Sequence, residues 1–430
     1  MKKLFLFAVF AAVASLCSMT AQTYSWVGSI TGDTASIVRS WGDDFLLTYT
    51  NSATGKGIIL TDVTGFTTTS SITPSAIKFN VPLTINIKDM RVLDNTLFYC
   101  GEYTVTGQGI YGWASLPSGT GQYTLTSACT CINKLAVNRP SGQFHMVAVG
   151  EDASSACVLI ETSDVQNGTT LTTVTLPYIS PTQYEVVDDV FFTDHYTVFV
   201  GRDRRIGNSV VSVRRSSASN ALDDISRCQL YRFVSDNPLV GITHSLALEN
   251  DRFAVAYVEE HPYARRLVMH RMEASTTGVQ MLNSQWNNYG INKDLSDITY
   301  LSATGQMVVL WKHDNLLSRM MLLEPANLTG YSFSELWTDM LQCKSIDRLG
   351  GYCFAIWGHY GFALQNSSLT LAPDSPYSCF RPAIMVANTM DNPTITSVLD
   401  CPSPTVFKVT HLPYSTLPTI ELNYTNCEKL

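Results

Sequence analysis

Residues 189–214 read DVFFTDHYTVFVGRDRRIGNSVVSVR. This stretch contains an apolar segment at 189–193, a turn at Asp194 and His195, an apolar segment at 196–201 and, after a polar loop, a third segment at 209–214. The β-branched and aromatic content predicts strands, and the polar residues between the first two segments suit a tight turn. The stretch therefore predicts three strands linked by short connections.

The same arrangement recurs along the chain. The central segment of the other units reads FLLTYT at 45–50, LFYCGEY at 97–103, FHMVAVG at 144–150, FAVAYVE at 253–259, QMVVLWK at 306–312 and YCFAIWG at 352–358. The units follow one another at intervals of about 51 residues, a period that indicates repeated supersecondary units. Strands this short leave room for a fourth strand in each unit.

Short hairpin-linked strands at this period are typical of β-propeller blades. By architecture, the chain resembles the seven-bladed β-propeller superfamily over about residues 30–368. The resemblance implies an all-β fold with seven blades of about 50 residues, and eight blades remain an alternative. No signature of a particular propeller family is present, and residues 324–337 are the best candidate for a short helix.

The first 21 residues have the layout of a bacterial secretory signal peptide. Two lysines precede an uncharged run at 4–16, and Ala21 precedes the expected cleavage point. The run is too short to span a bilayer and no later run is long enough, so we expect no transmembrane segment. We expect export to the periplasm, the cell surface or the medium. Leu16 before Cys17 disfavours a lipid anchor at that cysteine, since a small residue is needed there.

The expected organisation is a signal peptide at 1–21, blades at 22–368 and a proline-rich C-terminal segment at 369–430. Proline blocks the hydrogen bonds of a ladder, which restricts this segment to edge strands or extended covering. Residues 405–412 and 419–425 still alternate like strands. We expect them to close the propeller by pairing with 23–30, and an eighth blade is the alternative.

Ten cysteines follow the signal peptide, an even number that is compatible with disulfides in an exported chain. Cys343 and Cys353 flank a predicted turn at 347–349, so they are the disulfide candidate. No Cys-x-x-Cys is present, which argues against zinc knuckles and thioredoxin chemistry. The sequence predicts no metal site and no cofactor.

Composition excludes several classes of protein. A chain of 430 residues with 45% apolar and 15% charged residues can bury a large core, so wholesale disorder is excluded. The formal net charge of −8 argues against a nucleic-acid binder.

No catalytic residue can be named from the sequence. The serine-hydrolase elbow, the zinc-protease motif, the P-loop and the dinucleotide fingerprint are all absent. Neighbouring acids such as Asp188 and Asp189 would point to opposite faces of a strand, so they do not form a catalytic pair. The sequence therefore favours a protein that is not an enzyme. Side chains from several blades could still converge at a central channel.

Arginine is concentrated at 202–271, where eleven arginines and eight acids give a net charge of +3. Five of these arginines follow the central strands of two successive units, and equivalent loops lie on the same rim. They are Arg202, Arg204, Arg205, Arg265 and Arg266. Because arginine forks suit carboxylates, sulfates and phosphates, we predict a ligand-binding patch for an acidic glycan or a protein. Local pairing with Asp203, Glu259 and Glu260 is the alternative.

The favoured hypothesis is an exported, non-enzymatic propeller that binds a protein or glycan partner through one rim. Two alternatives remain open. One is a structural component of a cell-surface assembly, docked through the C-terminal segment. The other is a glycan-acting hydrolase with its active site at the channel mouth, which predicts carboxylates from several blades at that point.

Overall fold

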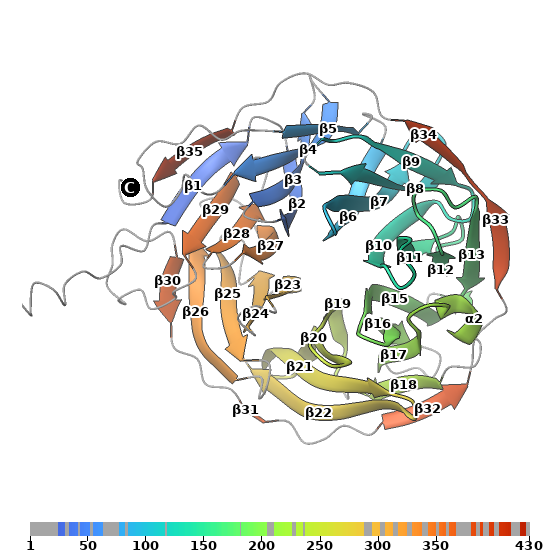
Figure 1. Cartoon of the computed structure of the whole chain (residues 1–430). Helices are drawn as coiled ribbons and strands as arrows, with labels where there is room; N and C mark the ends of the chain where they lie inside the picture. Colours follow the sequence, from blue (N-terminus) through green and yellow to red (C-terminus); the bar gives the residue numbers. More distant parts are fainter. Residues whose placement is uncertain are drawn as a thin grey trace, which may run out of the picture.

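The computed structural model is a β-propeller, in which antiparallel sheets are arranged in a ring (Figure 1). The described strands form seven sheets, so the predicted all-β propeller fold is confirmed. The structure describes residues 25–426 except 31–33, 42–43, 52–54, 63–76, 82–84, 117, 181, 204–209, 226–228, 235–236, 288–294, 302–305, 313–316, 325–328, 338–342, 350–351, 358–360, 367–379, 384–387, 390–394, 400–403 and 414–421.

In each sheet, an inner strand at the centre of the ring is followed outward by a second and a third strand in chain order. The inner strands are β2 Thr34–Trp41, β6 Ile85–Leu93, β10 Cys131–Asn138, β15 Gln183–Phe192, β19 Leu239–Ala247, β23 Leu295–Leu301 and β27 Cys343–Leu349. The second strands are β3 Asp44–Asn51, β7 Thr96–Tyr103, β11 His145–Glu151, β16 Tyr196–Asp203, β20 Arg252–His261, β24 Gln306–Lys312 and β28 Tyr352–Trp357. The second strands match the apolar segments that the sequence singles out.

The third strands are β4 Gly55–Asp62, β8 Gln108–Ser115, β12 Cys157–Thr162, β17 Val210–Ser217, β21 Ala264–Ser275, β25 Leu317–Glu324 and β29 Gly361–Asn366. The fourth strands are β5 Ile77–Val81, β9 Gly121–Thr126, β13 Thr170–Thr175, β18 Gln229–Val234, β22 Gly278–Asn287, β26 Thr329–Trp337 and, in the last sheet, β1 Ser25–Ile30. The first strand of the chain therefore completes the last sheet through its pairing with β29.

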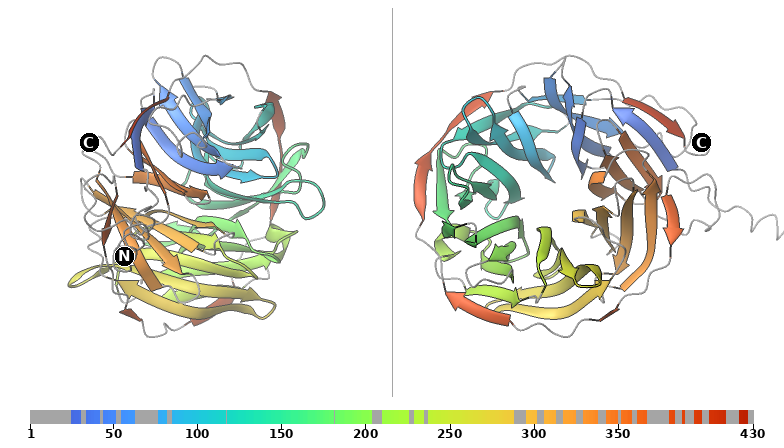
Figure 2. Two further views of the ribbon diagram at one scale, coloured as in Figure 1. Left: turned by 60° about the vertical axis from the view of Figure 1, so that its left-hand side comes forward. Right: turned by 180° about the vertical axis from the view of Figure 1, so that it is seen from behind.

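The C-terminal segment runs around the outside of the ring (Figure 2). Its strands are β30 Phe380–Ala383, β31 Asn388–Thr389, β32 Ile395–Leu399, β33 Thr405–Lys408, β34 Thr410–Pro413 and β35 Leu422–Asn426. In that order they pair with β26, β22, β18, β13, β9 and β1, and so cover the outer edges of six of the seven described sheets.

Two expectations about particular segments differ from the structure. Residues 405–412 pair with β13 and β9 rather than with 23–30, because the C-terminal segment reaches these sheets on its way around the ring. Residues 329–337 form strand β26, whose pairing with β25 outweighs the local helix signal. The described residues contain a short helix elsewhere, α2 Ala221–Ile225, whose first two amide groups donate to the carboxylate of Glu161.

The core lies between neighbouring sheets. Alternate residues of β20 illustrate this arrangement: Phe253 and Val255 pack toward the sheet of β16, whereas Ala254 and Ala256 pack toward the sheet of β24. Both faces of such a strand are buried, which explains why the second strands read as continuous apolar runs rather than alternating ones.

Each inner strand has a shift of register against its second strand. In three sheets a glycine lies opposite the shift: Gly101, Gly150 and Gly201. A Cβ atom at Gly201 would lie 1.9 Å from the carbonyl oxygen of Val186, and one at Gly101 would lie 2.0 Å from that of Asn86. The bulge therefore requires glycine where the sequence repeats it.

Candidate functional site

The bulge of the inner strands places charged side chains at the centre of the ring. Asp89, Asp189 and Asp297 are each the first paired residue after the shift in β6, β15 and β23. Lys134 and His244 hold the corresponding positions in β10 and β19. All three carboxylates are largely buried, with side-chain exposures of 1%, 6% and 12% in chain order.

Two of these aspartates join neighbouring inner strands. Oδ2 of Asp89 accepts the amide hydrogen of Leu135 at 3.2 Å. Oδ2 of Asp189 accepts the amide hydrogen of Ser245 at 3.0 Å and its hydroxyl hydrogen at 3.2 Å. The same relationship thus recurs from β6 to β10 and from β15 to β19. It gives both carboxylates a structural role.

Two arginines link acids that belong to different sheets. Arg39 of β2 donates to Oδ1 of Asp89 at 3.1 Å and to Oδ2 of Asp297 at 3.5 Å. Arg91 of β6 lies 3.4 Å from Oδ2 of Asp89 and 3.9 Å from Oδ1 of Asp189. Inner strands of four sheets are therefore connected through ion pairs.

The charges keep Asp89 ionised. Burial alone would raise the pKa of its carboxyl, but Arg91, Lys134 and Arg39, together with the amide of Leu135, outweigh burial and hold the pKa below its usual value. Burial lowers the pKa of His244, and Lys134 lowers it further. A general acid needs a carboxyl that keeps its proton near neutral pH, and Asp89 has the opposite tendency.

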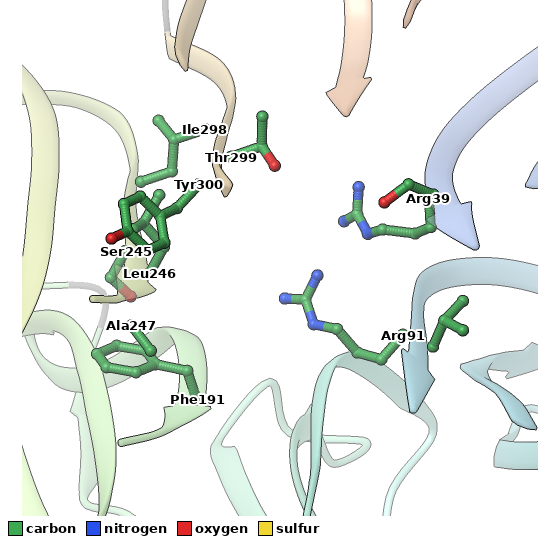
Figure 3. Close-up of a pocket in the computed structure, with 11 residues that line it drawn as sticks. Arg39, Arg91, Phe191, Ser245, Leu246, Ala247, Ile298, Thr299 and Tyr300 are labelled. Atoms are coloured by element: carbon green, nitrogen blue, oxygen red, sulfur yellow. The ribbon is translucent and has the colours of Figure 1, made fainter. Parts of the chain in front are cut away.

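A cavity of about 310 Å³ lies beside this network. Arg39, Arg91, Phe191, Ser245 and Tyr300 are among its lining residues, and all belong to inner strands. Figure 3 shows both guanidinium groups directed toward the opening, with the aromatic side chains on the other side. The sequence hypothesis of carboxylates converging at the channel mouth named neither the two arginines nor the three aspartates. A signal for the aspartates was present in the sequence, since each precedes an apolar residue in an inner strand.

The five predicted patch arginines have separate surroundings. Arg202 forms a double hydrogen bond with Asp188, at 2.8 and 2.7 Å. Arg265 lies 3.6 Å from Glu260 and Arg266 lies 3.9 Å from Glu259, while Arg204 and Arg205 fall outside the described residues. The guanidinium of Arg266 also lies over the ring of Trp286, with its centre 4.0 Å from the ring centroid. Each of the three described arginines thus has an acidic partner within its own sheet.

Other arginines of the 202–271 window form buried pairs. Arg214 binds both carboxylate oxygens of Glu185, at 2.7 and 2.8 Å, and both side chains are 1% exposed. Arg232 donates to Asp203 at 2.8 Å. Part of the arginine-rich window at 202–271 therefore serves buried ion pairs rather than a surface patch.

The predicted disulfide is not compatible with the register of its hairpin. Cys343 lies opposite Trp357, whereas Cys353 lies opposite Arg348. Four residues of β28 separate the two positions, about 13 Å along a strand, and disulfide-linked Cα atoms lie closer than about 7 Å. The two cysteines sit at opposite ends of the hairpin, so the prediction is wrong. Cys100, Cys129, Cys131 and Cys157 are buried free thiols.

Among the described residues, no group of three or more His, Cys, Asp or Glu side chains is arranged to hold a metal ion. In the same part of the chain, no helix has the length and apolarity that a membrane crossing requires.

No protein-family model and no curated protein matches the chain. Solved structures with a similar fold include virginiamycin B lyase from Staphylococcus aureus, with 10% identity and a TM-score of 0.48 over 80% of this chain and 99% of that one. An uncharacterised protein from Listeria monocytogenes shares 11% identity over 76% of this chain and 92% of that one, with a TM-score of 0.41.

A chain from a study of two prolyl endopeptidases shares 8% identity, with a TM-score of 0.41. That match covers 78% of this chain, and this chain spans 45% of the length of the endopeptidase. At these identities only the fold is comparable, so no activity is carried over to this protein.

Proposed function

We propose that this protein is an exported, non-enzymatic propeller with seven blades, one for each described sheet, that binds a protein or glycan partner through one rim. The rim in question carries the turns between second and third strands, such as the turn after His261 that contains Tyr263. We call it the Tyr263 rim. The starts of the inner strands lie at the same end of the ring, because β19 begins opposite the end of β20.

One observation supports this choice of rim. Five of the seven exposed large apolar side chains in the described part of the chain lie on it: Val105, Tyr178, Ile179, Ile242 and Tyr263. Their exposures range from 39% for Tyr178 to 92% for Tyr263. Val105 lies in the turn after β7, and Tyr178 and Ile179 lie in β14 Tyr178–Ser180, which pairs with the start of β15. Their occurrence on one rim supports the choice of this rim as the contact surface, since exposed apolar surface is what partner sites present.

Two of the predicted patch arginines lie beside Tyr263, one member of this apolar set. Arg265 and Arg266 lie at the start of β21, next to Tyr263. Glu260 and Glu259 balance the charges of these two arginines. This balance favours binding through apolar contact over binding through attraction of an anionic partner. The aliphatic side chains of Ile179 and Ile242 favour a protein as the partner.

The carboxylates at the ring centre support a protein without hydrolytic activity. Asp89 and Asp189 hold the amides of the next inner strand and lie beside arginine. Catalysis of glycoside hydrolysis needs one carboxyl with a raised pKa and one free carboxylate.

Binding arrays of purified surface proteins and of glycans test the proposal. The wild-type chain without residues 1–21 is compared with the Ile179→Ser/Tyr263→Ser variant and with Val406→Ser, an exposed residue of β33 that serves as control. We expect partners that bind the wild type and the control but not the rim variant. Partners that bind all three equally, or an absence of any partner, would overturn it.

A further inference from the structure

The cavity at the ring centre opens at the end opposite the Tyr263 rim. Its lining residues come from the last four positions of β2, β6, β15, β19 and β23, where each inner strand turns into the second strand. The turn between β19 and β20 contains Asp251, so we call this end the Asp251 rim. The cavity and the apolar set of the Tyr263 rim are thus separate features of the molecule.

The two guanidinium groups at the cavity differ in how they are used. Arg39 donates to the carbonyl oxygens of Met90 and Val38 and to two aspartates, and its side chain is 13% exposed. Arg91 donates through Nε to the carbonyl oxygen of Leu135 at 3.2 Å, and Nη2 faces Asp89 and Asp189. Its side chain is 31% exposed, and within the described residues Nη1 of Arg91 donates no hydrogen bond. Arg91 thus offers donors to the cavity.

The aspartates hold Arg91 through Nη2 and leave its Nη1 group, the free edge of the guanidinium, directed to the cavity. Asp89 and Asp189 lie deeper than the guanidinium, with side-chain exposures of 1% and 6%. Oδ2 of Asp189 accepts two hydrogen bonds from Ser245, and Oδ1 accepts the amide hydrogen of Val190 at 2.9 Å. The carboxylate oxygens of Asp89 and Asp189 already accept hydrogen bonds, so these acids hold Arg91 in place. The side of Arg91 that faces the cavity presents N–H groups.

The facing wall of the cavity carries apolar side chains beside the polar Ser245 and Thr299. Phe191, Leu246, Ile298 and Tyr300 contribute to it, and Figure 3 shows them across the opening from the two arginines. A volume of about 310 Å³ is at the lower end of the range for small-molecule sites. An anionic group near Arg91 and an apolar body against this wall would use both sides of the cavity.

We propose that this cavity binds a small organic anion, a monocarboxylate with an apolar body, whose carboxylate accepts hydrogen bonds from the free edge of Arg91. Inorganic phosphate is a poorer fit, since it has no apolar part and Arg39 is already engaged by two aspartates. This site is independent of the partner surface on the Tyr263 rim.

Calorimetric titration of the chain without residues 1–21 tests the proposal with three probes: benzoate, benzyl alcohol and inorganic phosphate. We expect benzoate to bind, and the alcohol and phosphate to bind at least about ten-fold more weakly, because each lacks one of the two contacts. Absence of benzoate binding, or binding of the alcohol or of phosphate as tight as that of benzoate, would overturn the proposal.

Two variants locate the binding. Arg91→Gln should weaken benzoate binding at least about ten-fold. Arg252→Gln removes the same charge from an arginine at the start of β20, on the same rim but outside the cavity lining, and should leave binding unchanged. Equal effects of the two substitutions would contradict the assignment.

A crystal of the wild-type protein soaked with 4-iodobenzoate covers the case in which Arg91→Gln does not fold. The iodine signal should lie against Phe191 and Tyr300, with the carboxylate at Arg91. Iodine at any other place, or none at all, would contradict the proposed site.

Discussion

Nη1 of Arg39 lies 3.5 Å from Oδ2 of Asp297, although the two residues are 258 positions apart in the chain. Arg39 lies in the inner strand β2 and Asp297 in the inner strand β23. The sheet of β27 lies between their two sheets in the ring. Arg39 also binds Asp89 on its other side. Charged side chains therefore connect the inner strands across the centre, in addition to the apolar contacts between neighbouring sheets.

Removing one member of the buried Arg214–Glu185 pair should be strongly destabilising. Glu185→Ala leaves a guanidinium that is 1% exposed without its carboxylate, which should lower the free energy of unfolding by about 3–5 kcal/mol. Urea denaturation measures the loss.

The matched control for this pair is the double variant Glu185→Leu/Arg214→Met, which removes both charges. It should lose less stability than Glu185→Ala, because no uncompensated charge is left in the interior. A double variant less stable than the single one would contradict this account.

The repeated glycines of the second strands should not tolerate a side chain. A methyl group at Gly201 would meet the carbonyl oxygen of Val186, so Gly201→Ala should lower the free energy of unfolding by about 1–3 kcal/mol. Thermal and urea unfolding check this. Gly107 lies in an open turn, where a Cβ atom would have no heavy atom within 4 Å. Gly107→Ala should therefore cost only the strain of its positive φ, and an equal or larger loss there would show that crowding is not the cause.

The turn between β15 and β16 and the turn between β19 and β20 should be joined by an ion pair that depends on pH. Nδ1 of His195 lies 2.7 Å from Oδ2 of Asp251, and this hydrogen bond and charge raise the pKa of the His195 imidazole. Burial would raise the pKa of Asp251, but hydrogen bonds from His195 and Thr193 hold it below its usual value.

The sign of the effect follows from these two directions. The ion pair is fully formed between the lowered pKa of Asp251 and the raised pKa of His195. It is lost as the pH rises through the pKa of His195. An NMR titration should show a higher midpoint for His195 in the wild type than in the Asp251→Asn variant. Equal midpoints would contradict the ion pair.

Deletion of residues 369–430 should destabilise the protein without opening the ring. The ring is closed by pairing of β1 with β29, which the deletion leaves in place, but six described sheets lose their outermost strand. Exposed sheet edges promote association. We expect a lower melting temperature and oligomers in size-exclusion chromatography with light scattering. A monomer of unchanged stability would favour a docking role for this segment instead.

Secretion should remove the first 21 residues. Expression with the complete N-terminus in a bacterial host, followed by mass spectrometry of the exported protein, should show a chain that begins at Gln22. Retention of the intact chain in the cytoplasm would contradict export.

The sequence predicted much of the fold because its signals are local and repeated. The apolar runs of the second strands and the glycines at 101, 150 and 201 recur at the blade period, and each follows from burial on both faces or from the bulge beside it. The course of the C-terminal segment was not predictable in detail, since its short strands bond to sheets whose order is known only from the fold.

The central network was beyond the sequence for another reason. Arg39 and Asp297 meet only because the ring brings distant inner strands together. The predicted disulfide failed because facing residues in a hairpin depend on the register, which places Cys353 opposite Arg348. Arg202 is engaged by Asp188, an acid of the adjacent strand that the sequence hypothesis did not consider as its partner.

The central claim, recognition through the Tyr263 rim, is tested most directly by hydrogen–deuterium exchange on the protein bound to a partner from the arrays. We predict protection of amides at 178–184, 239–242 and 259–266, with no change in the turns of the Asp251 rim. Protection confined to the Asp251 rim or to the outer strands of 369–430 would contradict the account.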